Sequence, residues 1–228
     1  MRINKYLAHK GIATRTGVDE LIRSNKILIN GKVAKLGDKV LENDNIEVRG
    51  THTKKKYIYL AYNKPKGIVS TNPQREEKGI MDSAKFPPGV FPVGRLDKES
   101  YGLMILTNDG RITDRLLNPI YSHEKEYIVD VGRKFTPGFI KNMEEGVDIG
   151  DAITKPAKVE KIDDSIFKIV LTEGRNRQIR RMTEKLGYTV NDLQRVRVQN
   201  IKLEKIPPNS FREISGDEQS EFLKSIGL

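Results

Sequence analysis

Residues 93–109 read VGRLDKESYGLMILTND, a cluster of charged residues that leads directly into an apolar run. The run from Leu103 to Leu106 predicts a buried strand, with the charged cluster at its start. In an extended segment Arg95 and Asp97 lie on the same face, so the two side chains could pair and keep the carboxylate ionised. An ionised carboxylate held in a loop at the end of a sheet is a candidate nucleophile. The alternative is a surface ion pair that only closes a turn.

The composition indicates a globular protein with a polyanionic partner. The 228 residues include 41 Lys and Arg against 31 Asp and Glu, a formal net charge of +10. Length and hydrophobic content suit one sizeable domain plus a small one. The charge favours nucleic acid first and an anionic membrane surface second.

Cofactor motifs and targeting segments are missing from the sequence. There is no cysteine, and the three histidines are His9, His52 and His123, without metal-ligand spacing, so we expect no metal. Neither a dinucleotide-binding fingerprint nor a phosphate-binding loop is present, so we expect no cofactor. No apolar run is long enough for a membrane span, and the N-terminus lacks the apolar core of a signal peptide. We therefore expect a cytoplasmic protein without a membrane partner.

The first fifty residues predict a small separate domain. Ile3, Tyr6 and Leu7 recur at helical spacing up to Gly11, and a second helix carries residues 18–22. Residues 27–29 and 32–33 flank Asn30-Gly31, a strong hairpin signal, and residues 45–48 form a return strand. Seven of the cations in this segment could follow RNA phosphates: Lys5, Lys10, Arg15, Arg23, Lys26, Lys32 and Lys35. The alternative is a small domain without a ligand.

Residues 51–56, THTKKK, predict a charged linker, and residues 57–228 then form a second domain. Strand-like runs occur at residues 57–64, 66–70, 103–107, 125–131 and 167–172. Helices are expected at residues 111–117, 137–145, 177–186 and 217–226. Because no regular crossover helices separate the strands, we expect an α+β fold whose mixed, largely antiparallel sheet is flanked by helices.

A second charged cluster lies at residues 174–181, which hold four arginines and no acid. Asn176 could cap a helix on which Arg177, Arg180 and Arg181 gather within one turn. Three cations at the start of a helix repel one another unless an anion binds, so we interpret the cluster as an anion site. The alternative is a solvated face on which Arg180 pairs with Glu184.

A third segment, residues 123–131, begins polar and continues as an alternating strand with Tyr127 at the junction. A tyrosine at such a place usually packs. It could also offer its ring to a base and its hydroxyl to a proton transfer.

Together these three segments resemble the pseudouridine synthases, and within them the ribosomal RNA branch typified by RsuA, RluB, RluE and RluF. GRLDKESYGLMILTNDG is similar to the catalytic motif of that family, HEKEYIV to its tyrosine motif and GRNRQIRRM to its arginine motif. Residues 1–49 are similar to the S4 RNA-binding domain, so the N-terminal unit is expected to be S4-like over residues 1–50. The pattern is most similar to the RluF type.

The resemblance implies an isomerase that converts a uridine of 23S ribosomal RNA to pseudouridine without a cofactor. It makes Asp97 the nucleophile that attacks either the base or the ribose of a flipped-out uridine, and a chain without thiols would need such a carboxylate. Tyr127 would stack on the base and assist deprotonation, and Arg180 would hold Asp97 or a phosphate. The expected RNA contacts are Arg95, Leu96, Lys98, Asn176, Arg177, Gln178, Arg181, Lys5, Arg15 and Lys32.

Several alternatives stay open at the level of sequence. The RNA could instead be transfer RNA or small-subunit ribosomal RNA, as free RNA or as a ribosome precursor particle, and the chain could be a non-catalytic S4-type RNA-binding protein. A monomer is expected. The chain departs from the S4 pattern at Thr14-Arg15-Thr16, where two adjacent arginines are usual, so one expected RNA contact is missing.

Overall fold

The structure is a computed structural model that describes residues 1–10, 12–41, 43–50, 56–74 and 76–228. Its N-terminal unit contains α1 (Ile3–His9), α2 (Arg15–Arg23) and a small sheet of β1 (Ile27–Ile29), β2 (Lys32–Val33) and β3 (Ile46–Val48) in the order β2-β1-β3. Asn30 and Gly31 have φ of 51° and 79°, which closes the β1–β2 hairpin as predicted. The predicted helix end at Gly11 and most of the linker, residues 51–55, lie outside the described residues.

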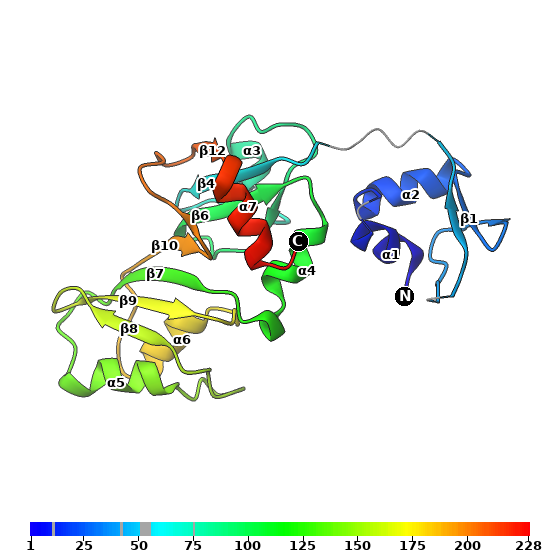
Figure 1. Cartoon of the computed structure of the whole chain (residues 1–228). Coiled ribbons are helices and arrows are strands. Elements are labelled where there is room, and N and C mark those ends of the chain that lie inside the picture. Colours follow the sequence, from blue (N-terminus) through cyan, green and yellow to red (C-terminus); the bar gives the residue numbers. More distant parts are fainter. Residues whose placement is uncertain (11, 42, 51–55, 75) are drawn as a thin grey trace.

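The second unit is built on a nine-stranded sheet (Figure 1). Its strands are β4 (Tyr59–Lys64), β5 (Phe91–Val93), β6 (Tyr101–Thr107), β7 (Lys125–Asp130), β8 (Lys158–Lys161), β9 (Ile166–Leu171), β10 (Asp192–Val198), β11 (Ile201–Lys202) and β12 (Phe211–Glu213). Its helices are α3 (Ile80–Ser83), α4 (Arg111–Leu117), α5 (Pro137–Glu145), α6 (Gln178–Lys185) and α7 (Gly216–Ser225), with the 3-10 turn η1 (Pro119–Tyr121) after α4.

The strand order β12-β4-β6-β10-β7-β9-β8 can be followed from top to bottom in Figure 1, with β5 paired to β6 and β11 to β10. Every pairing in this sheet is antiparallel except β6 with β10. The expected α+β fold with a largely antiparallel sheet is therefore confirmed. The strand predicted at residues 66–70 is wrong, because that segment makes only an isolated bridge between Val69 and Gly79.

The parallel β6–β10 pair joins the two halves of the sheet, and it requires a glycine. Gly102 has a φ of 103°, and a Cβ atom there would lie 2.3 Å from the carbonyl oxygen of Arg195. No side chain fits at that distance. Gly102 thus allows the backbones of β6 and β10 to meet directly in front of the loop that carries Asp97.

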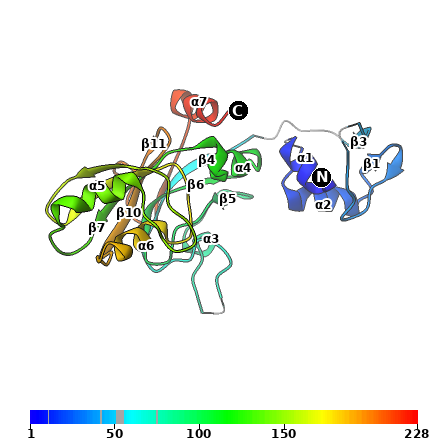
Figure 2. The same cartoon turned by 90° about the horizontal axis from the view of Figure 1, so that it is seen from below.

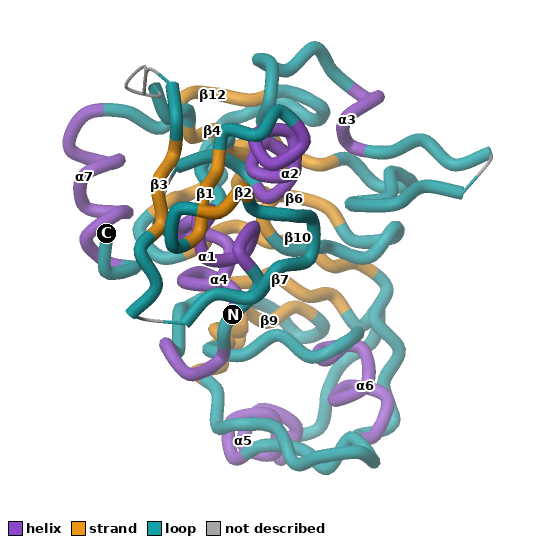
Figure 3. The backbone as a smooth tube through the Cα atoms, turned by 90° about the vertical axis from the view of Figure 1, so that its right-hand side faces the viewer, coloured by secondary structure: helices purple, strands orange, loops and turns teal. Residues whose placement is uncertain are grey.

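Helices cover the sheet on different sides in its two halves. One core packs α5 and α6 against β7 to β10, through residues such as Phe139, Met182 and Phe167. Another packs α4 and α7 against β4 and β6, with Phe222 buried completely. Figures 2 and 3 show α6 and α7 on opposite sides of the sheet. The α6 side of the sheet, near the β6–β10 junction, is where the candidate site lies.

Within the described ranges, no helix combines the length and the apolar character needed to cross a membrane.

Candidate active site

Asp97 lies in the loop between β5 and β6. Lys64, the last residue of β4, holds this loop by hydrogen bonds to its backbone. Lys64 is fully buried, and its ammonium group donates to the carbonyl oxygens of Ser100 at 2.7 Å and Asp97 at 3.2 Å. Burial lowers the pKa of Lys64 to about 8, against the opposing effect of Asp97. The hydroxyl of Ser70 holds Leu96 by accepting from its N–H at 2.9 Å and donating to its carbonyl at 2.6 Å. The backbone around Asp97 is therefore held rigidly although it belongs to no strand.

The carboxylate of Asp97 is half-buried and faces two arginines of the 174–181 cluster. Its Oδ2 atom lies 3.9 Å from Nη1 of Arg177 and 3.9 Å from Nε of Arg180. In the part of the chain that the structure describes, no donor reaches hydrogen-bond distance of either carboxylate oxygen. The two arginines thus face the carboxylate without the tight hydrogen bonds that would occupy its lone pairs. The direct Arg95–Asp97 pair expected from the sequence is wrong, because Arg95 is exposed and the facing cations come from α6 and its start.

Arg180 is held in place by two further contacts. Its guanidinium group donates to the carbonyl of Val190 at 3.3 Å and to the hydroxyl of Ser100 at 3.4 Å. The Nε atom is buried, and among the described residues it has no hydrogen-bond partner. It is aimed at Asp97 rather than at Glu184, so the alternative of an Arg180–Glu184 surface pair is not what the structure contains. Burial and the neighbouring Arg177 lower the pKa of Arg180, which remains a cation because its ordinary pKa is so high.

The segment before α6 has a strained backbone. Arg177 is the N-terminal cap residue of α6 and adopts a left-handed φ of 49°, which costs energy for a residue with a Cβ atom. The cap expected at Asn176 is wrong, since the helix begins one residue later and has no side-chain cap. Buried Glu173 fixes the turn instead by accepting from Nε2 of Gln178 at 2.9 Å and from the backbone N–H of Lys155 at 3.0 Å.

Tyr127 lies on β7, which is separated by β10 from β6, the strand that follows the Asp97 loop. It pairs in register with Arg195 of β10, and it packs against the hydrophobic clusters of both halves. Directly opposed residues of an antiparallel pair point to the same face, as do residues i and i+2 of one strand. Lys125, Tyr127 and Arg195 therefore share the face of the sheet that bears Asp97.

One cavity of about 650 Å³ is lined by Asp97, Lys125, Tyr127 and Arg195. Its volume is in the range of small-molecule sites. Asp97 is the one acidic residue among the described residues that line it, and Tyr127 lines it as well. The cations that line it are Arg95, Lys98, Lys125, Arg175, Arg177 and Arg195. An adjoining hollow adds Arg180 and Gln178 to Asp97 and Tyr127. The arrangement brings a carboxylate and a phenol together in a strongly basic pocket.

The other residues singled out in the sequence separate into two groups. Leu96 and Asn176 line the basic pocket, whereas Gln178 is almost fully buried and engaged with Glu173. Arg181 points away from Asp97 and bonds Asp151 and, at 2.6 Å, the carbonyl of Ile149.

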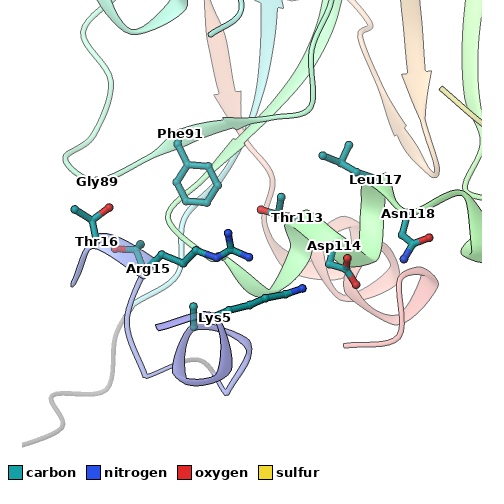
Figure 4. Close-up of a pocket in the computed structure, with 12 residues that line it drawn as sticks. Lys5, Arg15, Thr16, Gly89, Phe91, Thr113, Asp114, Leu117 and Asn118 are labelled. Carbon is teal, nitrogen blue, oxygen red and sulfur yellow. The ribbon is translucent and has the colours of Figure 1, made fainter. Parts of the chain in front are cut away.

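In the N-terminal unit, Lys5 and Arg15 line a separate cavity of about 840 Å³ together with α4 (Figure 4). Both side chains extend toward the part of α4 that carries Thr113 and Asp114. Leu117, at the end of α4, lines this cavity and also the basic pocket. Lys32 is exposed on β2 and lines neither.

Three residues of the site were missed at the level of sequence. The signal for Lys64 was present, since it precedes a proline at the end of an apolar strand in YNKPKG. Lys125 and Arg195 carry no such signal, because their strands, KEYIVD and DLQRVRV, contain other polar residues and the two cations resemble solvent-facing positions.

Comparison with known proteins identifies the family. Residues 58–185 match the family model for RNA pseudouridylate synthase, and residues 1–46 match that for the S4 domain. The chain belongs to the RNA pseudouridine synthases. The resemblance noted in the sequence is thereby confirmed, and with it the N-terminal S4 domain.

Among the relatives of this pseudouridine synthase is the dual-specificity RNA pseudouridine synthase RluF of Salmonella typhi. It is 41% identical over 229 residues, which cover 99% of this chain and 79% of the relative. The ribosomal large subunit pseudouridine synthase B of Bacillus subtilis is 34% identical, over 95% of this chain and 93% of the relative. A crystal structure of a pseudouridylate synthase superimposes with a TM-score of 0.72 and 29% identity, covering 99% of each chain.

Proposed function

We propose that this enzyme isomerises a specific uridine of 23S ribosomal RNA to pseudouridine in the cytoplasm, with Asp97 as the nucleophile. The observation that carries the proposal is the position of Asp97, the one carboxylate among the described residues that line a pocket with six cations. A pocket of that charge attracts an RNA backbone, and the carboxylate in its lining would then meet the base or sugar that the RNA presents.

The chemistry follows from the groups present. With the uridine flipped out of its stack, a carboxylate oxygen of Asp97 adds to the base or the ribose while the N-glycosidic bond breaks. The freed base turns and its carbon C5 bonds to the ribose C1′. C5 then loses its proton, N1 carries a proton in place of its former bond to the ribose, and Asp97 is released. The reaction is an isomerisation, so no electrons are exchanged with a partner. In this proposal Tyr127 stacks on the base and assists removal of the C5 proton, and Arg180 holds Asp97; their position beside Asp97 supports these roles.

The remaining proposed contacts divide by position. Arg95, Leu96, Lys98, Asn176 and Arg177 would contact the target nucleotide and its neighbours. Lys5 and Arg15 would contact the same RNA farther along, because their cavity meets the basic pocket at Leu117. Arg181 and Gln178 are occupied within the protein, so we assign them to shaping the pocket.

The relatives support ribosomal RNA as the substrate, since the name of the Bacillus protein specifies the large ribosomal subunit. The Salmonella relative is named as dual-specific, which favours a second RNA class. Transfer RNA is our second candidate. All the residues that we propose for catalysis belong to one chain, so we propose that the enzyme acts as a monomer on either class of RNA.

The test of the reaction is Asp97→Asn, which keeps the shape of the side chain but replaces the nucleophilic carboxylate by a neutral amide. We expect release of tritium from 5-tritiated uridine in ribosomal RNA to be abolished, with RNA binding retained. Undiminished release would rule out Asp97 as the nucleophile. Mapping pseudouridines by chemical adduct and primer extension in 23S RNA and transfer RNA, from cells with and without the gene, identifies the target.

A further inference from the structure

Two cations on the pocket side of the sheet have no acidic partner. Arg195 is 5% exposed, and it donates to the carbonyl of Leu103 at 2.7 Å and to the sulfur of Met104 at 2.8 Å. Within the described ranges, the Lys125 ammonium group has one acceptor, the carbonyl of His123 at 3.3 Å. Among the described residues, no carboxylate forms an ion pair with either side chain.

The opposite face of the same strands is arranged differently. A bulge between Arg195 and Arg197 turns Arg197 to this opposite face, where it bonds Glu126 at 2.9 Å and Glu124 at 3.0 Å. Lys168 of β9 pairs with Glu160. The sheet therefore neutralises its cations on the side away from Asp97 and leaves two unneutralised on the side of the pocket.

An unpaired cation is costly where water is partly excluded. Burial and, to a smaller extent, the charge of Arg195 together lower the pKa of Lys125 to about 8. The two cations thus repel one another. An anion placed between them would remove both the desolvation cost and the repulsion.

The chemistry of the site indicates which anion this is. The argument rests on the proposed function, in which the pocket binds a flipped nucleotide. Such a nucleotide brings its own backbone phosphates into the pocket. Lys125 and Arg195 flank Tyr127 on one face of the sheet, so an anion held there lies beside the ring proposed to stack on the base. We propose that Lys125 and Arg195 form a binding site for one backbone phosphate of the RNA, next to the uridine bound at Asp97.

The test uses a short RNA hairpin that carries the uridine identified by mapping. In separate RNAs, each phosphate near that uridine is replaced by a neutral methylphosphonate, with the two stereoisomers separated. For the wild-type enzyme we expect one position at which the neutral linkage lowers kcat/KM by roughly 10- to 100-fold, the worth of a charge-assisted hydrogen bond.

The matching protein variant is Lys125→Met, which keeps the length of the side chain and removes its charge. On unmodified RNA we expect a loss of the same size, and Lys125→Arg should restore most of the activity. At the sensitive position, the neutral linkage should lower kcat/KM of Lys125→Met by less than about threefold, because the interaction with the phosphate is already absent in this variant. Lys158→Met is the control, since Lys158 lies on the opposite face of the sheet and is highly exposed.

The outcomes are distinct. The phosphate site is disproved if the wild-type enzyme converts the unmodified RNA and every neutral linkage lowers kcat/KM by the same factor in Lys125→Met as in the wild type. A methylphosphonate series without effect, together with a pH–rate profile shifted by Lys125→Met, would make Lys125 a proton carrier instead. If the wild-type enzyme does not convert the unmodified RNA, the proposed function fails and this inference with it.

Protein stability separates a binding role from a structural one. Because Lys125 has no acidic partner and is repelled by Arg195, Lys125→Met should unfold at the same temperature as wild type or higher. A clear loss of thermal stability with unchanged discrimination among the RNAs would assign Lys125 to the fold and overturn the inference.

Discussion

At the scale of single residues, Asp97 depends on cations that approach it without bonding it closely. Arg177 and Arg180 both lie 3.9 Å from the same oxygen, yet their surroundings differ. The Arg180 side chain is 15% exposed and anchored to Val190 and Ser100, whereas that of Arg177 is 52% exposed. The buried arginine is suited to holding the carboxylate, and the exposed one to meeting RNA.

Replacement of the two arginines by alanine should separate these roles. We expect Arg180→Ala to lower kcat by about 100-fold, as for loss of one preorganised electrostatic contact, with little change in RNA affinity. Arg177→Ala should weaken binding and reduce the slope of log affinity against log salt by about 1. Single-turnover kinetics and filter binding between 50 and 200 mM salt, roughly the range in which counterion release is evident, measure both. Equal effects of the two variants on kcat and on affinity would contradict this division.

At the scale of elements, the Asp97 loop obtains its rigidity from another strand. Lys64 ends β4 and donates to carbonyl groups on both sides of the turn at Asp97. A buried lysine with these contacts acts as an internal clamp between β4 and the start of β6.

Lys64→Met should therefore lower the free energy of unfolding by roughly 3 kcal/mol, because it leaves buried carbonyl groups without donors. The difference should grow with pH. The folded pKa of Lys64, about 8, lies below the ordinary value of 10.5, so between these values the unfolded chain binds more protons and rising pH stabilises the wild type. Urea denaturation of both proteins at pH 7, 8 and 9.5 tests this, and a difference that shrinks with pH would show the sign to be wrong.

The elements that the sequence predicted best are those with clear boundaries. The helices at residues 111–117 and 137–145 coincide with α4 and α5, because a turn or Thr136-Pro137 marks their starts. The central strand β10 was missed. Its apolar positions are interrupted by Arg195 and Arg197, and a bulge between these two residues breaks the alternation. The same interruption explains why Arg195 was missed. Asp97, Tyr127 and Arg180 were proposed from their charged or polar segments and from the resemblance to the family, whereas Arg195 on an inward face was not, since inward cations contradict the pattern used to find strands.

At the scale of the whole molecule, the S4 domain and the catalytic domain together line the cavity that contains Lys5 and Arg15 (Figure 4). In the stretch Thr14-Arg15-Thr16, where two adjacent arginines are usual, Thr14 caps α2 by accepting from the N–H of Gly17 at 3.1 Å. Arg15, the one arginine of this stretch, lines the cavity.

Removal of both charges, in Lys5→Gln with Arg15→Gln, should weaken RNA binding and lower the salt slope by about 2. The value of kcat at saturating RNA should not change, because neither residue lies near Asp97. Lys32→Gln provides the comparison, since Lys32 is exposed on β2 outside this cavity. If Lys32→Gln matched the double variant in affinity and slope, the RNA would follow the hairpin of the S4 domain rather than the cavity.

The close approach at Gly102 has a consequence for how the enzyme fails. Asp97, the proposed nucleophile, comes from one half of the sheet, and Tyr127, Arg177 and Arg180 come from the other. Among the described strands, the β6–β10 pair alone joins the two halves. Each half keeps a hydrophobic core of its own. A small opening at this junction would therefore silence the enzyme while both cores stayed folded, so inactivation by heat should precede melting.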